Sequence, residues 1–81
     1  MGMVKVRFFG RFAEEIARSV EMPIECGMTV AGLREALASR FGADQLLGAR
    51  VLAAVDDRIV HDDLVLLSGQ AVDLLAPLSG G

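Results

Sequence analysis

The side chains that most often carry out chemistry are few in this sequence and stand apart from one another. The single histidine, His61, is followed by a carboxylate, and such a pair could act as a general base. A lone histidine in a polar loop is more often a solvated residue, and no second histidine is present to complete a metal site. The paired acids Asp56-Asp57 and Asp62-Asp63 could bind a cation, but in turns such residues usually serve turn formation and solubility. We therefore expect no metal site and no catalytic base among these residues.

The single cysteine, Cys26, is the other candidate nucleophile. One cysteine excludes an internal disulfide, a cysteine-ligated iron–sulfur cluster and a structural zinc cluster. Apolar and polar residues alternate over 20–26, which predicts that Cys26 lies on the buried face of a strand and behaves as an inert small apolar side chain. A persulfide carried on this sulfur is the alternative. The folded body therefore offers no constellation that would make the chain an enzyme on its own.

The C-terminal pair Gly80-Gly81 offers a different chemistry, in which the reactive group is the main-chain carboxylate of Gly81. A tail without Cβ atoms on its last two residues can thread a channel that is too narrow for other residues. It could thereby bring the carboxylate to ATP in the active site of another protein, and its terminal carbonyl is open to attack. A frayed chain end or a cloning remnant is the alternative interpretation of the same pair.

Composition narrows the class of protein and of partner. The 81 residues are expected to form one domain, 1–81. The net charge of −3, a single lysine and the absence of Trp and Tyr argue against a nucleic-acid partner. No apolar run approaches the ~20 residues that span a bilayer, and no secretion signal or myristoylation motif is evident, since Val6 stands where that motif requires Ser or Thr. We expect a cytoplasmic protein with no membrane partner.

Apolar periodicity predicts five strands, at residues 4–9, 20–26, 51–55, 58–60 and 71–76. In the first strand Val4, Val6 and Phe8 share the buried face, and Phe9 lies on the outer face with Lys5 and Arg7. Pro23 has no N–H to donate, so the second strand should lie at an edge of the sheet. Part of the segment 61–67, which holds Leu64, Leu66 and Leu67, must reach the core.

Two helices are predicted between these strands. A short one covers 11–18, where Phe12 and Ile16 form an apolar edge. The main helix begins after an N-cap at Thr29 and ends at Gly42. Its apolar stripe is Val30, Leu33, Leu37 and Phe41, and the remaining surface carries Arg34, Glu35, Ser39 and Arg40.

This order of elements predicts an α+β fold in which one main helix packs on one face of a mixed four- or five-stranded sheet. Parallel pairing of the first and last strands would leave the C-terminal segment projecting from the middle of the sheet. Pro77 ends the last strand, and residues 77–81 are expected to form a flexible, exposed Gly-Gly tail.

Five segments of the sequence resemble a known family, the small subunit of molybdopterin synthase, within the ubiquitin-like β-grasp sulfur carriers that also include the thiamine-pathway carrier. The segments are Val4–Phe9, Thr29–Arg34, Leu52–Val55, Gly69 with Val72, and Pro77–Gly81. The resemblance covers nearly the whole chain, and the length matches the molybdopterin type better than the shorter thiamine type. The family commonly has Asp-Gly-Asp where this chain has Ser68-Gly69-Gln70, and often two prolines where it has Ala76-Pro77.

The resemblance implies a β-grasp fold and a defined chemistry at the tail. An E1-like adenylating enzyme would use ATP to activate the Gly81 carboxylate, and a sulfur donor would convert it to a thiocarboxylate. The tail, residues Leu78, Ser79, Gly80 and Gly81, would insert into a large partner subunit, where the sulfur passes to a pterin precursor. The chain itself would bind no cofactor, and would be the non-catalytic small subunit of molybdopterin synthase.

The resemblance also implies that Phe9, Ile59 and Leu75 contact the large subunit. The sequence pattern agrees for Phe9 and Leu75, because both are apolar residues on the polar side of their strands. Three other functions stay open. They are a carrier for the thiamine thiazole or cysteine pathways, a ubiquitin-like modifier that joins Gly81 to a target lysine, and a β-grasp interaction module with an inert tail.

Overall fold

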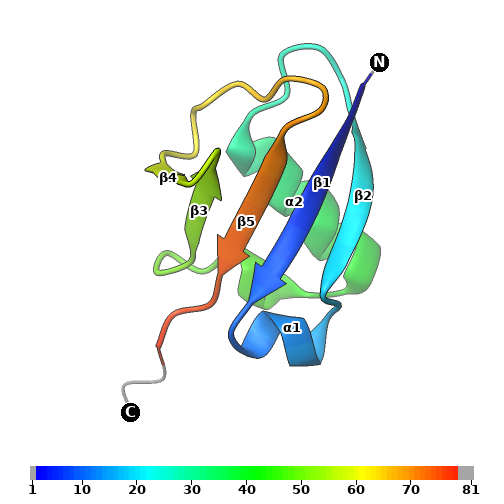
Figure 1. Cartoon of the computed structure of the whole chain (residues 1–81). Helices are drawn as coiled ribbons and strands as arrows, with labels where there is room; N and C mark the ends of the chain where they lie inside the picture. The colour runs from blue at the N-terminus through cyan, green and yellow to red at the C-terminus, as the bar shows by residue number, and fades with distance from the viewer. Residues whose placement is uncertain (1, 79–81) are drawn as a thin grey trace.

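The computed structural model describes residues 2–78 of the chain, and contains eight elements (Figure 1). Ser79, Gly80 and Gly81, which carry the predicted chemistry, lie outside the described residues. The elements in chain order are β1 (Gly2–Phe9), α1 (Arg11–Glu15), β2 (Ser19–Ile24), α2 (Val30–Phe41), the 3-10 helix η1 (Asp44–Leu47), β3 (Leu52–Val55), β4 (Arg58–Val60) and β5 (Ala71–Leu75).

The five strands form one mixed sheet in the order β2-β1-β5-β3-β4, and α2 crosses one face of it (Figure 1). The central strands β1 and β5 are parallel, whereas β1–β2, β5–β3 and β3–β4 are antiparallel pairs. The predicted α+β class, the parallel pairing of the first and last strands, and the edge position of the second strand are confirmed. Because β1 and β5 run in the same direction, both end at the same edge of the sheet.

The hydrophobic core lies between α2 and the inner face of the sheet. Val30, Leu33 and Leu37 of α2 are fully buried, and the inward side chains Val4, Val6 and Phe8 of β1 meet them. The Phe41 ring packs edge-on against Phe8 with the ring centroids 6.5 Å apart. Burying one such aliphatic side chain stabilises the fold by about 1.5–3 kcal/mol.

The two ends of α2 have the structure that their residues predict. The Thr29 hydroxyl accepts a hydrogen bond from the backbone N–H of Gly32 at 3.2 Å. Gly42 has a φ of 61°, in the left-handed region that favours glycine, and its N–H donates to the carbonyl of Ala38. Local sequence therefore fixes the length and position of the main helix.

Two local predictions need correction, and a third is confirmed. The segment after β4 reaches the core as predicted, through Leu66, whereas Leu64 and Leu67 are exposed. The helix α1 ends at Glu15 rather than Arg18. Cys26 is exposed instead of buried, because β2 ends at Ile24 and the chain then turns.

The turn after β2 explains the position of Cys26. The N–H of Met28 donates to the carbonyl of Glu25 at 3.0 Å, and Gly27 adopts a φ of 85°. The alternation of apolar residues extends one residue pair beyond the strand, so periodicity alone could not mark where β2 leaves the sheet. Among residues 2–78, no helix has the length and apolar character needed to cross a membrane.

Candidate functional site

The sheet face opposite α2 carries a set of apolar side chains that strand register brings together. Phe9 of β1 lies beside Leu75 of β5, and Leu75 lies beside Leu52 of β3. In the neighbouring row Ala54 of β3 pairs with Ile59 of β4. Phe9, Leu52 and Ile59 are 42%, 49% and 62% exposed, and Leu75 is half-buried. We call Phe9, Leu52, Ile59 and Leu75 the open-face patch.

Three of these four residues were singled out from the sequence, and the structure brings them onto one face of the sheet. Leu52 was missed as a contact residue, because residues 51–55 are all apolar and their alternation does not show which face of the strand is exposed. Contiguous exposed apolar surface on a small protein usually marks a binding surface.

A charged pair lies in the same face, in the row next to Phe9 and Leu75. Arg7 donates from Nε to Oδ1 of Asp73 at 2.6 Å and from Nη2 to Oδ2 at 2.9 Å. This bidentate hydrogen bonding, followed by the charge of Asp73, raises the pKa of Arg7. The guanidinium carbon also lies 5.9 Å from the centroid of the Phe9 ring. Arg7 therefore links the central strands β1 and β5 and contacts the patch.

The chain leaves the sheet beside the patch. The N–H of Ala76 donates to the carbonyl of Phe9 at 3.4 Å, and Pro77 has no N–H with which to continue the ladder. Leu78, the last described residue, is 92% exposed. Figure 1 shows this segment leaving the end of β5 next to the end of β1. The predicted reactive group on Gly81 lies outside the described residues.

The remaining chemical candidates form no site. His61 is exposed in the loop after β4, and Asp56 and Asp57 form the turn between β3 and β4 with φ values of 53° and 66°. Within residues 2–78 no group of three or more His, Cys, Asp or Glu side chains is arranged to hold a metal ion.

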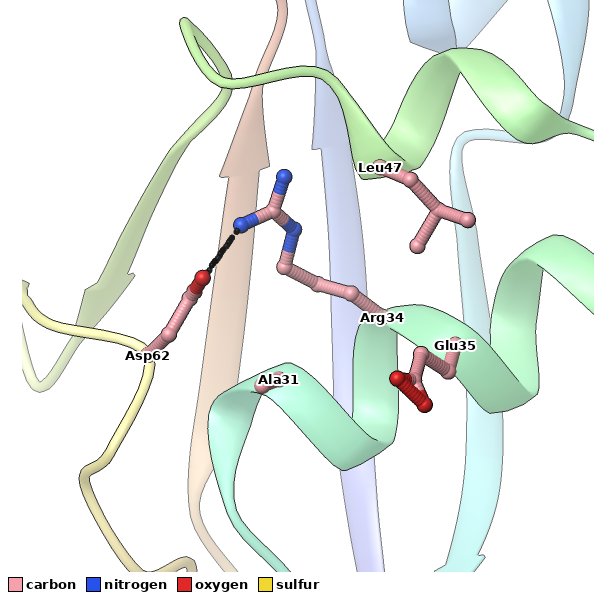
Figure 2. Close-up of a pocket in the computed structure, with 5 residues that line it drawn as sticks. All are labelled: Ala31, Arg34, Glu35, Leu47 and Asp62. Carbon is pink, nitrogen blue, oxygen red and sulfur yellow. Dashed lines mark hydrogen bonds and ion pairs between the residues drawn. The ribbon is translucent and has the colours of Figure 1, made fainter.

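A cavity of about 270 Å³ beside α2 is lined by Ala31, Arg34, Glu35, Leu47 and Asp62 (Figure 2). Arg34 donates to both Asp62 oxygens at 2.9 Å, to the carbonyl of Leu46 at 2.8 Å and to that of Gly48 at 2.7 Å. Figure 2 shows Glu35 pointing away from the pair. Since the Arg34 guanidinium already holds these three partners, it joins segments of the fold and is not free to bind a ligand.

The prediction that Arg34 lies on the solvent-exposed surface of the helix is wrong, because the residue is only 7% exposed. The pattern of α2 puts Arg34 next to the apolar stripe, and η1, in a segment for which no helix was predicted, covers it. The sequence signal available was weak: an arginine adjacent to Leu33, followed by apolar residues in the connection.

Solved structures of other proteins share this fold. The small archaeal modifier protein 1 of Haloferax volcanii superimposes with a TM-score of 0.85 at 15% identity, covering 96% of this chain and 100% of the other. A Pyrococcus furiosus protein assigned as subunit 1 of molybdopterin converting factor gives 0.83 at 26% identity, covering 96% and 100%. A chain from the complex of subunits 1 and 2 of molybdopterin-converting factor of Helicobacter pylori gives 0.67 at 25% identity, covering 98% and 99%.

Comparison with curated protein sequences gives no match. The model of the ThiS family matches residues 6–81, which is nearly the whole chain. The structural matches confirm the ubiquitin-like β-grasp fold predicted from the sequence. On the family match and the fold together, this chain belongs to the ThiS family of ubiquitin-like sulfur carriers and modifiers.

Proposed function

We propose that this protein is the sulfur carrier of molybdopterin synthesis and acts as the small subunit of molybdopterin synthase. The observation that carries the proposal is the open-face patch, which lies beside the point where the tail leaves the sheet. An apolar docking surface next to a chain exit suits a protein that delivers its terminus into a partner. The likeness to the Pyrococcus furiosus protein and to the Helicobacter pylori complex supports the molybdopterin pathway.

In the proposed reaction the Gly81 carboxylate attacks ATP on an adenylating enzyme and forms an acyl-adenylate with release of pyrophosphate. A sulfur donor of the hydrosulfide class then attacks the acyl carbon and displaces AMP, and loss of the proton from sulfur leaves a terminal thiocarboxylate. The thiocarboxylate sulfur is the nucleophile toward the pterin precursor, and acid–base groups come from the large subunit.

The contribution of this chain is positioning. Residues 77–81, fully extended, reach at most about 18 Å beyond Ala76. A partner active site must therefore lie within that distance of the chain exit when the open-face patch is docked. The patch fixes where the tail enters the large subunit, so that the terminal sulfur is held in position for attack on the pterin precursor.

Intact mass spectrometry tests the carrier chemistry. The protein is incubated with ATP, the cognate adenylating enzyme and a sulfide source, and the expected product has one oxygen replaced by sulfur at Gly81. A variant that lacks Gly81 is the control and should gain no sulfur. An unchanged mass, while a known carrier is modified in parallel, would contradict the proposal.

The pathway is tested separately by mixing the thiocarboxylated protein with the large subunit and the pterin precursor. Formation of molybdopterin supports the proposed pathway. Sulfur transfer only to a thiazole or cysteine precursor would assign the protein to one of those pathways. Covalent adducts with lysines of other proteins in cell extract would instead assign it as a modifier.

A further inference from the structure

A charged pair that borders an apolar surface is an unusual feature of this sheet face. The row that holds Arg7 and Asp73 continues to Ala54 and Ile59, and the adjacent row is Phe9, Leu75 and Leu52. Apolar residues of the open-face patch thus lie on two sides of the pair. A partner that covers the patch must also cover the pair.

The two members of the pair do not present themselves equally to a partner. The Arg7 side chain is 43% exposed, whereas that of Asp73 is 13% exposed. Arg7 binds Asp73 through Nε and Nη2, and among the described residues no acceptor contacts its Nη1. The guanidinium of Arg7 therefore faces outward, with N–H donors on Nη1 that a partner could bind, and the carboxylate of Asp73 lies beneath it.

A hollow of about 540 Å³ beside Arg7 is lined by positively charged side chains. Its lining includes the cations Lys5, Arg7 and Arg18 together with the Phe9 ring, and no acidic residue. The whole chain has a net charge of −3, so this positive region is local. It adjoins the apolar patch through Phe9, which belongs to both.

Docking against a wholly apolar surface would strip water from the free N–H groups of Arg7 without replacing it. Buried charged donors without an acceptor strongly oppose binding, whereas a carboxylate in reach restores the lost hydrogen bonds and adds a favourable charge interaction. Charge complementarity of this kind chiefly sets which partner is accepted.

We propose that the open-face patch selects a partner that places an acidic side chain opposite Arg7, within an otherwise apolar contact surface. This rests on the proposed function, and the partner is the large subunit of molybdopterin synthase. Arg7 acts as a specificity-determining residue for docking, and Asp73 positions its guanidinium. The apolar residues around the pair supply the contact area.

Reversing the polarity of the pair tests the proposal. The variant Arg7→Asp/Asp73→Arg keeps the net charge and both residue types, and presents a carboxylate to the partner. Its Kd for the purified large subunit, measured by isothermal titration calorimetry, is expected to rise at least ~tenfold. An unchanged Kd would mean that the pair only links β1 to β5, and would overturn the proposal.

A second variant keeps the test decisive if the reversed pair does not fold. Arg7→Leu/Asp73→Ala makes the face more apolar, so a purely apolar interface would bind it equally or more tightly. The proposal expects weaker binding and a smaller loss of affinity between 50 and 300 mM salt, because the charge interaction is gone. Weaker binding with an unaltered salt dependence would trace the effect to a displaced Phe9 ring, and would refute charge recognition.

Phe9→Ala separates failure of this inference from failure of the proposed function. If Phe9→Ala weakens binding and the reversed pair does not, the docking surface stands and the acidic partner group is wrong. If Phe9→Ala also binds like the wild type, the docking surface itself is wrong. Sedimentation of the isolated chain gives the remaining outcome: a dimer that Phe9→Ala dissociates would assign the face to a second copy and overturn the proposal.

Discussion

Arg34 joins three parts of the molecule through one guanidinium. It binds the carbonyls of Leu46 and Gly48 near η1 and the carboxylate of Asp62 after β4. Replacing Arg34 with Leu leaves the buried carbonyl of Leu46 without its donor, whereas the Gly48 carbonyl still accepts from the N–H of Val51 at 3.2 Å. We expect this change to lower the free energy of unfolding by about 1–3 kcal/mol. Urea denaturation followed by circular dichroism measures this change.

Asp62→Asn is the matched control for the Arg34 prediction. The Asp62 side chain is half-exposed, and solvent screens its attraction for Arg34, so we expect a loss of no more than about 1 kcal/mol. If the two variants lost equal stability, the ion pair rather than the two carbonyl contacts would be the stabilising interaction.

Phe9 is exposed, and it is the last residue of β1, beside the end of β5. We expect Phe9→Ala to raise the Kd for the large subunit at least ~tenfold, because large aromatic side chains dominate such interfaces. Surface plasmon resonance measures the change, and the free energy of unfolding should fall by less than about 1 kcal/mol. Leu67→Ala, an exposed apolar residue outside the patch, is the control and should bind normally.

At the scale of elements, the β3–β4 turn contains backbone strain. Asp56 and Asp57 both have positive φ, as a two-residue type I′ hairpin turn requires, and glycine suits its second position better than aspartate does. We expect Asp57→Gly to raise the free energy of unfolding by about 0.5–1 kcal/mol. Thermal unfolding measures the gain. Asp57→Ala, which keeps a Cβ at the same φ, should give no gain.

The main helix and the positions of the strands along the chain could be predicted because their signals are local. The cap at Thr29, the stop at Gly42 and the alternation of β1 each depend on residues close in sequence. Cys26, Arg34 and Asp73 could not be placed in the same way. The exposure of Cys26 follows from a local turn that alternation does not mark. The burial of Arg34 and Asp73 depends on tertiary contacts, with η1 and with Arg7, that periodicity does not report.

The docking surface was partly predictable for a related reason. Phe9 and Leu75 stood out because an apolar residue on the polar side of a strand is visible in the sequence. Their common row with Leu52, and the charged pair beside it, depend on the register of strands that are more than 20 residues apart in the chain. Parallel pairing of β1 with β5 is therefore the single feature that converts separate residues into a surface.

At the scale of the whole molecule, folding and the proposed chemistry occupy different parts of the chain. Within residues 2–78, the core and the five strands end before Leu78, and the last sheet contact described is the hydrogen bond from the N–H of Ala76 to the carbonyl of Phe9. A chain shortened to residues 1–78 should keep its free energy of unfolding within ~0.5 kcal/mol of the full chain, because no described core residue is lost. It should accept no sulfur in the mass-spectrometric assay.

A chain shortened to residues 1–70 would lose β5 from the centre of the sheet, and should not fold. If the 1–78 chain were clearly less stable than the full chain, the tail would have a structural role, and loss of sulfur transfer on deleting Gly81 would no longer by itself identify the Gly81 carboxylate as the reactive group.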